Sequence, residues 1–182
     1  MKRIRLRFIV VGLVLVAAAL VWRAWTARPV VELPELVTSD STGVGLRAVT
    51  LWFGSAGGDS LVAEPREMPE QAGLHERVAA IVAALEQGPR AGGTRTLPEG
   101  TQLLHAYVDE AGLLTLDLSR PFRQGFHGGA RAEEMTLGSL VRTLATNVPE
   151  ARRIRIVCAG VAVPTLGGHF PLDQPLAPEE WP

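Results

Sequence analysis

Two stretches of the chain carry apolar residues at the spacing of an amphipathic helix. In the first stretch the apolar positions fall at i, i+4, i+7, i+8 and i+11, and they are Leu74, Val78, Ile81, Val82 and Leu85. This spacing puts them on one face, which predicts a helix packed on a core. Gly88 and Pro89 end it, because glycine adopts the left-handed conformation common after helices and proline cannot continue one. A second helix is predicted from about Ala130 to Asn147, with the stripe Leu137, Leu140, Val141 and Leu144.

Shorter stretches alternate apolar and polar residues, as half-buried strands do. In the first predicted strand the inward positions are Val49, Leu51 and Phe53. A return strand begins at Leu61, and we expect Pro65 to stop it because proline cannot donate a hydrogen bond to a sheet. A later strand alternates Ile154, Ile156 and Cys158, and the turn Ala159-Gly160 leads from it into a short strand over residues 161–163.

A hairpin is predicted where residues 102–109 and 113–119 flank Glu110-Ala111-Gly112. A three-residue loop with glycine last suits a type I turn followed by a left-handed residue. On the apolar face this register pairs Val108 with Leu114, Ala106 with Leu116, and Leu104 with Leu118. On the other face it pairs His105 with Asp117 and Tyr107 with Thr115. A slip of one residue would bury Asp117, so the pattern specifies the register strongly.

The order of these elements resembles the GerMN domain family over roughly residues 46 to 176. The matching segments are the strand 49–53, the helix end Ala84 to Pro89, Leu97 to Thr101, the strand Leu114 to Ser119, Thr143-Leu144, and Arg153 to Gly160. The resemblance implies an α+β fold with a mostly antiparallel sheet and two main helices. It also implies a non-catalytic module of the bacterial envelope, associated with sporulation, germination or peptidoglycan, in which self-association is plausible.

The N-terminus has the pattern of an export signal. The basic residues Lys2, Arg3, Arg5 and Arg7 precede a run from Phe8 to Trp22 that has no charge. As a helix the run is about 22 Å long, and a hydrocarbon core is about 30 Å thick, so residues 24–27 would extend it into the interface. We expect an uncleaved signal anchor, because Trp25 lies at −3 of the Trp25-Thr26-Ala27 site; the alternative is a cleaved signal peptide. Basic residues stay on the cytoplasmic side, which predicts a single-pass protein of the cell membrane with an extracytoplasmic C-terminal domain.

Three regions follow from this reading. Residues 1–28 form the cytoplasmic tip and transmembrane helix, residues 29–45 form a linker, and residues 46–182 form the GerMN-like domain. Beyond residue 28 the chain has 12 basic and 19 acidic residues, a net charge of −7. Nucleic acid is therefore not an expected partner, because phosphate binding depends on clustered lysine and arginine. Cys158 is the one cysteine, and its position far from the N-terminus argues against a lipidated anchor.

The search for chemistry finds few candidates. None of the histidines His75, His105, His127 and His169 has zinc-binding spacing. His105 and Asp117 are candidates for a general base and its orienting partner, although an exposed cross-strand pair is the simpler interpretation. Ser119, His127 and Asp117 lie close enough in sequence to be considered as a catalytic triad. The simpler interpretation is that Ser119 and Asp117 make hydrogen bonds at the end of a strand. We therefore predict no catalytic, metal or cofactor site.

The sequence leaves two classes of function. The first is a membrane-tethered, non-catalytic binding or assembly module whose partner is a protein, peptidoglycan or a second copy of the chain. Glycan binding by Trp52, Tyr107 and Trp181 is a variant of this class. The second is an envelope hydrolase or amidase-like enzyme that uses His105, Asp117 or His127. The two classes differ in whether these three side chains converge on one pocket.

Overall fold

The computed structural model describes Trp22 and residues 45–181. The chain divides into two units, Met1–Gly43 and Val44–Pro182, and the fold below belongs to the second. The predicted membrane segment, residues 8–22, lies outside the described residues apart from Trp22. Within the described part of the chain, no helix combines the length and apolar character that a membrane crossing requires. The anchor and the linker therefore stay predictions.

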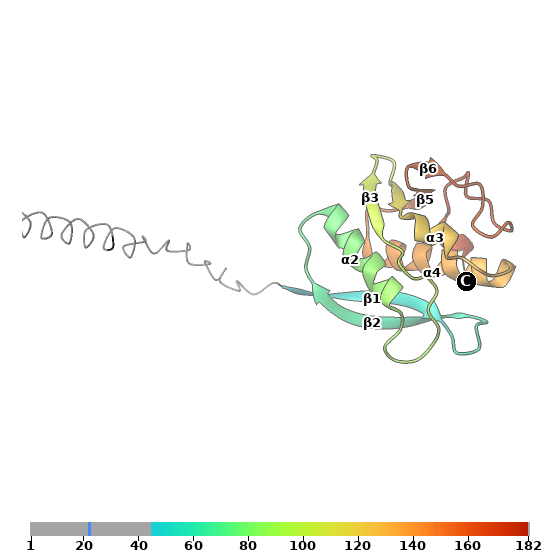
Figure 1. The fold of residues 1–182 in the computed structure, drawn as a ribbon, viewed down its shortest axis with the longest axis horizontal. Helices are drawn as coiled ribbons and strands as arrows, with labels where there is room; N and C mark the ends of the chain where they lie inside the picture. The colour runs from blue at the N-terminus through green and yellow to red at the C-terminus, as the bar shows by residue number, and fades with distance from the viewer. Residues whose placement is uncertain (1–21, 23–44, 182) are drawn as a thin grey trace, which may run out of the picture. The chain divides into compact units, whose positions relative to one another are not determined.

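The domain begins with a two-stranded antiparallel sheet (Figure 1). Strand β1 (Leu46–Gly54) pairs with β2 (Leu61–Pro69), with Leu51 opposite Glu64. The predicted alternation in β1 is confirmed, because Val49, Leu51 and Phe53 are all buried. The expectation that Pro65 stops β2 is wrong, since the strand continues through it to Pro69.

Backbone direction explains why β2 tolerates Pro65. Pro65 lies opposite Thr50, whose N–H donates to Asn147 Oδ1 and whose carbonyl accepts from Asn147 Nδ2. The backbone groups of Thr50 therefore point away from β2, and Pro65 must point its own toward the open edge. A proline on an open edge loses no ladder hydrogen bond and blocks the addition of a further strand.

The second sheet has the order β3-β4-β5-β6 and is only partly antiparallel. Its strands are β3 (Leu103–Val108), β4 (Leu113–Leu118), β5 (Arg153–Cys158) and β6 (Val161–Ala162). Strand β4 pairs with β5 in parallel, because α3 (Arg120–Gln124) and α4 (Ala130–Asn147) form a crossover between them. The expectation of mostly antiparallel pairing is confirmed, and β4–β5 is the one parallel pair among the described strands. Parallel neighbours need a crossover, which the helices supply.

The predicted hairpin register matches the observed one for most of the hairpin and differs from it at one end. His105 lies opposite Asp117, Tyr107 opposite Thr115, and Val108 opposite Leu114, as predicted. Leu118, however, lies opposite Leu103 and not Leu104, because the register shifts between Leu103 and His105. Ser119 N donates to Gln102 O at 2.8 Å, which fixes the strand ends and leaves Leu104 as an extra residue.

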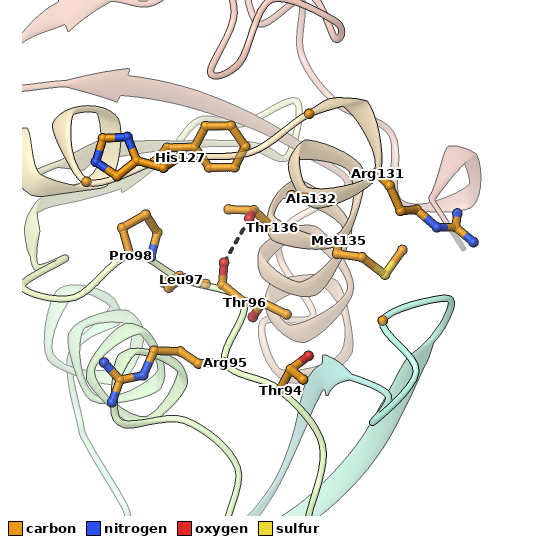
Figure 2. A pocket seen from close by; sticks show the side chains of 14 residues that line it. Thr94, Arg95, Thr96, Leu97, Pro98, His127, Arg131, Ala132, Met135 and Thr136 are labelled. Atoms are coloured by element: carbon orange, nitrogen blue, oxygen red, sulfur yellow. Dashed lines mark hydrogen bonds between the residues drawn. The ribbon is translucent and has the colours of Figure 1, made fainter.

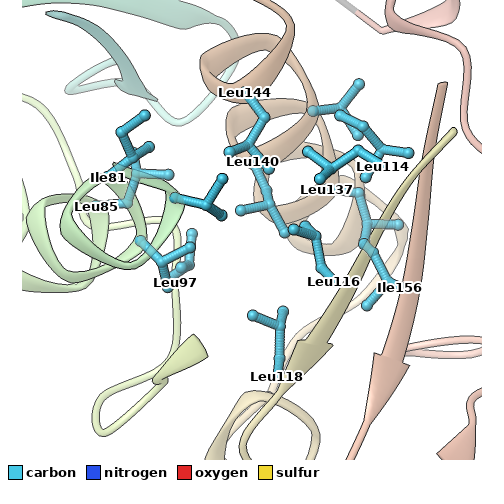
Figure 3. Packing of buried hydrophobic residues seen from close by; sticks show 14 of the residues in the cluster. Ile81, Leu85, Leu97, Leu114, Leu116, Leu118, Leu137, Leu140, Leu144 and Ile156 are labelled. Carbon is cyan, nitrogen blue, oxygen red and sulfur yellow. The ribbon is translucent and has the colours of Figure 1, made fainter. Parts of the chain in front are cut away.

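Helix α4 has the predicted bounds, and α2 (Leu74–Gln87) contains the predicted stripe and ends before Gly88 as expected. The two helices pack around one core. Figure 3 shows leucines of α4 directed both toward α2 and toward the strands β4 and β5. Leu85, Leu116 and Leu140 are completely buried at this centre. The short helix α3 was not predicted; Phe122 on it is fully buried. A 3-10 turn, η1 (Pro178–Glu180), lies near the end of the described chain.

Candidate functional site

The structure confirms that His105 and Asp117 are cross-strand neighbours, but it gives them different surroundings. His105 is exposed, and its ring lies 6.4 Å from the ring of His75 on α2. Asp117 Oδ1 accepts a hydrogen bond from Gly160 N at 2.9 Å, so this carboxylate holds the β5–β6 turn. No hydrogen bond joins His105 to Asp117 among the described residues.

The proposed triad does not assemble either. Ser119 Oγ accepts from Gln102 N at 2.9 Å and donates to Gly100 O at 3.2 Å, so it serves the hairpin end. His127 is exposed in the loop after α3 and lines a different part of the surface. Cys158 is buried, and its Sγ lies 3.4 Å from Ser119 O. Among the described residues, no hydrogen bond joins Ser119, Asp117 and His127 into a triad.

The three aromatic residues considered for glycan binding are also separated in their contacts. The Arg142 guanidinium lies 3.7 Å from the centroid of the Trp52 ring. Trp181 packs on Phe170 with ring centroids 5.4 Å apart. Tyr107 alone of the three is well exposed, at 66%. Among the described residues no group of three or more His, Cys, Asp or Glu side chains is arranged to hold a metal ion.

A groove of about 580 Å³ lies where the start of α4 meets two loops (Figure 2). One wall is the segment Thr94 to Pro98, and the other is formed by residues 125–129 and the first turns of α4. His127 and Arg131 lie at separate ends of the groove in Figure 2. Met135 and Thr136 lie on its α4 side and are buried.

A chain of hydroxyl groups fixes the floor of this groove. Thr136 Oγ1 donates to Thr96 O at 2.8 Å, and Thr96 Oγ1 lies 2.6 Å from Ser139 Oγ. Ser139 Oγ in turn donates to Trp52 O at 2.5 Å. A serine hydroxyl has one hydrogen, so Thr96 must be the donor to Ser139. The floor is therefore a rigid connection between α4, β1 and the wall segment.

The groove is lined by basic but not acidic side chains, although its rim is not strongly positive. Arg95, His127 and Arg131 are the basic residues in its lining. Arg131 Nη1 pairs with Glu134 Oε2 at 2.6 Å, and its Nη2 donates to Asp59 O at the same distance. Hydrogen bonds from the Ser55 and Ser60 side chains lower the pKa of Asp59, with a further contribution from Arg131. The groove thus offers a binding surface and no paired nucleophile and base.

Glu133 is the most buried carboxylate of the described chain, with an exposed fraction of 0%. Its oxygens accept from the N–H groups of Leu166, Gly167 and His169 at 2.8–3.0 Å and contact His169 Nδ1 at 3.0 Å. Burial alone would raise the pKa of Glu133, but the hydrogen bonds, led by Gly167 N–H, outweigh burial and lower it. The side chain therefore holds the C-terminal segment on α4 as a charged acceptor.

Glu64 and Arg66 form a second buried group, between β2 and the end of α2. Their side chains approach to 2.6 Å, and Arg66 also donates to the carbonyls of Ala84 and Gly88. Burial would raise the pKa of Glu64, but the N–H of Ala91, the Arg66 side chain and the N–H of Arg90 together lower it. Gly88 and the following turn are thereby fixed to the sheet.

The polar residues that are buried as a whole are hydrogen-bonded inside the described domain, whereas Nε1 of Trp52, Nε1 of Trp181 and Nε of Arg77 are buried atoms without a partner. Each of the following has a hydrogen bond to another described residue: Glu64, Arg66, Thr96, Thr101, Glu133, Thr136, Ser139, Thr143 and Asn147. Sequence reasoning missed these roles, because a polar residue in a helix predicts a solvated face as readily as a buried one. The one usable signal was the position of Glu133 in the first turn of α4, where an acidic residue is favourable.

Solved structures of similar fold come from two bacteria. The tandem GerMN domains of the sporulation protein GerM from Bacillus subtilis match with a TM-score of 0.62 and 14% identity, over 75% of this chain and 48% of that one. The first GerMN domain of the same protein matches with a TM-score of 0.61 and 17% identity, over 73% and 98% of the two chains. A putative lipoprotein from Clostridium perfringens matches with a TM-score of 0.53 and 25% identity, over 75% and 91%.

The present chain spans about half of the tandem-domain structure, which corresponds to one module. No curated protein is significantly similar to it in sequence. The model of the family described as Germane, sporulation and spore germination, matches residues 50–163, which contain both sheets and both main helices. The chain therefore belongs to the Germane family.

Proposed function

We propose that this protein is a membrane-tethered, non-catalytic module that binds or assembles with a partner in the bacterial envelope. The observation that carries the proposal is that, among the described residues, no hydrogen bond joins His105, Asp117 and His127, although His105 and Asp117 are cross-strand neighbours. Asp117 holds a turn, and the two histidines are exposed in different surroundings. A hydrolase needs a nucleophile, a base and an orienting group within hydrogen-bond reach of one another.

Membership of the Germane family supports a role in sporulation or spore germination. The similar structures include a sporulation protein and a putative lipoprotein. Cys158 of the present chain is buried in β5, so it does not supply a lipid anchor in this fold. The uncharged run from Phe8 to Trp22 takes that role in our proposal, with the domain outside the cytoplasm.

The groove at the start of α4 is the surface on which we place the partner. It combines an apolar side chain, Met135, with the hydrogen-bonding groups of His127 and Arg131. The hydrogen bonds through Thr96 and Ser139 join the walls of the groove. The groove is therefore preformed, and a partner loses little affinity to the entropic cost of ordering it. A preformed, mixed polar and apolar recess suits recognition of a peptide or a glycan better than chemistry.

A fusion of alkaline phosphatase to the C-terminus tests the tether and its orientation. The enzyme folds only outside the cytoplasm, so we expect an active fusion in the membrane fraction. A reporter active only in the cytoplasm, fused at the same point, should give no signal. Activity of that second reporter together with an inactive phosphatase would reverse the proposed topology.

Substitution of the candidate catalytic groups tests the absence of catalysis. We expect His105→Ala and Asp117→Asn to leave the cellular role intact at wild-type protein levels. His127 lines the groove proposed for the partner, so His127→Ala reports on binding and not on catalysis. Asparagine at 117 keeps an oxygen that can accept from Gly160 N, so this change removes the charge and preserves the turn. Loss of the role at either His105 or Asp117, with an unchanged melting curve, would favour the enzyme alternative.

A further inference from the structure

A second recess lies on the other side of α3, against the β5–β6 turn. Its volume is about 450 Å³, and it is separate from the groove at the start of α4 because the two share no lining residue. Its lining comes from α3 and from the region of the β5–β6 turn: Arg120, Arg123, Gln124, Cys158, Ala159, Val161 and Val163. Val161 is 63% exposed, which is high for a valine in a strand.

The side chains of Arg120 and Arg123 are unpaired and line a recess together; Arg90, Arg152, Arg153 and Arg155 are also unpaired in the described chain but do not line it. Arg120 and Arg123 are both exposed, and neither side chain has a hydrogen bond or ion pair with any residue that the structure describes. By contrast, the guanidinium groups of Arg66, Arg77 and Arg131 each pair with a glutamate. Arg120 and Arg123 lie three positions apart on a helix, which puts them on neighbouring parts of one surface.

The turn that lines the recess together with the arginines has an unusual residue in a strained conformation. Ala159 has φ 51° and Gly160 has φ 75°, as in a two-residue type I′ hairpin turn. The first position of such a turn favours asparagine, because alanine at positive φ brings its Cβ close to the backbone. The alanine keeps a methyl group in the lining of the recess where asparagine would place a polar amide.

We propose that this recess binds a carboxylate carried on an apolar stem, such as the C-terminal carboxylate of a peptide. The planar guanidinium groups of Arg120 and Arg123 suit the two oxygens of a carboxylate. The stem would lie on Ala159, Val161 and Val163, which offer apolar surface beside the charges. A recess of this volume falls within the range of small-molecule sites.

The charge of the whole domain restricts the anion further. With a net charge of −7 beyond residue 28, the domain repels extended polyanions, and two arginines provide a local site only. An inorganic phosphate would use the arginines without using the apolar wall. The recess therefore favours a single carboxylate with an apolar neighbour over a phosphate-rich polymer.

This inference goes beyond the proposed function, which places the domain in the envelope without naming a ligand for this surface. The two can fail separately. If the recess binds no carboxylate, the phosphatase fusion still reports the topology, and His105→Ala and Asp117→Asn still report the absence of catalysis.

Titration of the full-length, isotope-labelled chain in detergent micelles, followed by amide NMR, tests the site. The probe is N-acetyl-leucine, and its neutral partner is N-acetyl-leucinamide. We expect N-acetyl-leucine to shift the backbone amide signals of Ala159, Gly160 and Val161 in a saturable way. We expect N-acetyl-leucinamide to bind at least tenfold more weakly than N-acetyl-leucine. Parallel titrations use inorganic phosphate as the free phosphate ligand and glycerol 3-phosphate as the analogue of a lipid headgroup.

Variants then assign the binding to named side chains. Arg120→Gln and Arg123→Gln should each weaken N-acetyl-leucine binding about tenfold, because each removes charge-assisted hydrogen bonds. Arg90→Gln is the matched control, since Arg90 is an exposed arginine outside the lining of the recess. Val161→Ser should weaken N-acetyl-leucine and leave any phosphate binding unchanged.

Several outcomes would overturn the proposal. Equal binding of N-acetyl-leucine and its amide would show that no carboxylate is recognised. Unchanged binding in Arg120→Gln and Arg123→Gln, with native spectra, would remove the arginines from the site. Tighter binding of phosphate or glycerol 3-phosphate than of N-acetyl-leucine would replace the carboxylate by a phosphate ligand.

Discussion

At the scale of single residues, polar side chains of α4 complete the hydrogen bonding of the first sheet. Strand β1 has no strand on the side that faces α4. Asn147 instead bonds both backbone groups of Thr50, and Thr143 Oγ1 accepts from Trp52 N at 3.0 Å. Buried backbone groups need partners, so these side chains take the place of a strand.

Asn147→Ala tests whether the Asn147 side chain provides the hydrogen bonds that a neighbouring strand would otherwise give to β1. The change leaves the N–H and C=O of Thr50 without partners, each at a cost of about 1–3 kcal/mol. We expect a loss of roughly 2–4 kcal/mol in the free energy of unfolding, measured by urea denaturation. Thr146→Ala is the control, because Thr146 is exposed and bonds only within its own helix. Equal stability of the two variants would show that Asn147 does not hold β1.

Glu133→Gln tests the buried charge through its pH dependence. The pKa of Glu133 is lowered in the folded state. The carboxylate therefore contributes stability above its unfolded pKa of about 4.3, and this contribution is lost as the pH falls through the lower folded pKa. The glutamine variant should be less stable at neutral pH by about 1–3 kcal/mol and should lose less stability on acidification.

The adjacent residue provides the control for this experiment. Glu134 is only partly buried and pairs with Arg131, so Glu134→Gln should change stability by less than about 1 kcal/mol. Thermal melting between pH 3 and 7 gives both curves. A Glu133→Gln curve parallel to that of the wild type would mean that Glu133 does not contribute to acid sensitivity.

At the scale of elements, α4 determines the arrangement of everything else. Its leucines pack on α2 and on the strands β4 and β5, as Figure 3 shows. Ser139, Thr143 and Asn147 recur every fourth residue, which puts them in one row along the helix. That row faces β1, so α4 has one apolar and one hydrogen-bonding contact surface.

Leu85→Asp tests the packing of α2 on this core. Leu85 is completely buried, so the variant would place an unpaired carboxylate among apolar side chains at a cost of several kcal/mol. A typical domain is stable by about 5–15 kcal/mol, and we expect the variant to unfold. Ala83→Asp, on the exposed side of the same helix, should fold like the wild type by circular dichroism. A wild-type melting temperature for Leu85→Asp would contradict the packing of α2.

At the scale of the whole molecule, the basic N-terminus and the acidic domain predict a protein divided between two compartments. Six of the 18 basic residues lie in the first 28 positions, and all 19 acidic residues lie later. By the positive-inside rule we therefore propose that the tip stays in the cytoplasm and that the domain is exported. The lone Cys158 is buried and forms no disulfide, so the domain does not depend on oxidation for stability.

Mass spectrometry of the membrane-extracted protein tests whether the N-terminal segment is retained. We expect peptides that contain Arg23, because the bulky Trp25 disfavours signal peptidase at the one site beyond the apolar run. The protein recovered from the soluble fraction serves as the comparison. A mature N-terminus near residue 20 or 28 would identify a cleaved signal peptide.

The sequence determined the features that depend on short-range periodicity. It predicted the stripe and the end of α2, the bounds of α4, the alternation in β1, and most of the hairpin register. These succeed because burial of one face imposes a period of 3.6 or 2 on the residues themselves. It also showed that the histidines lack metal-binding spacing, since such motifs are local.

Tertiary structure decided the features in which distant segments supply each other's partners. Strand β2 passes through Pro65 because Thr50 bonds Asn147, which lies 97 residues away from it in the chain. Strand β5 lies parallel to β4 because α4 crosses between them, and Leu104 bulges because Gln102 and Ser119 fix the strand ends. The recess between Arg120 and Val161 likewise exists only once α3 meets the β5–β6 turn. Such pairings depend on which backbone groups remain unbonded after folding, and no local period in the sequence records them.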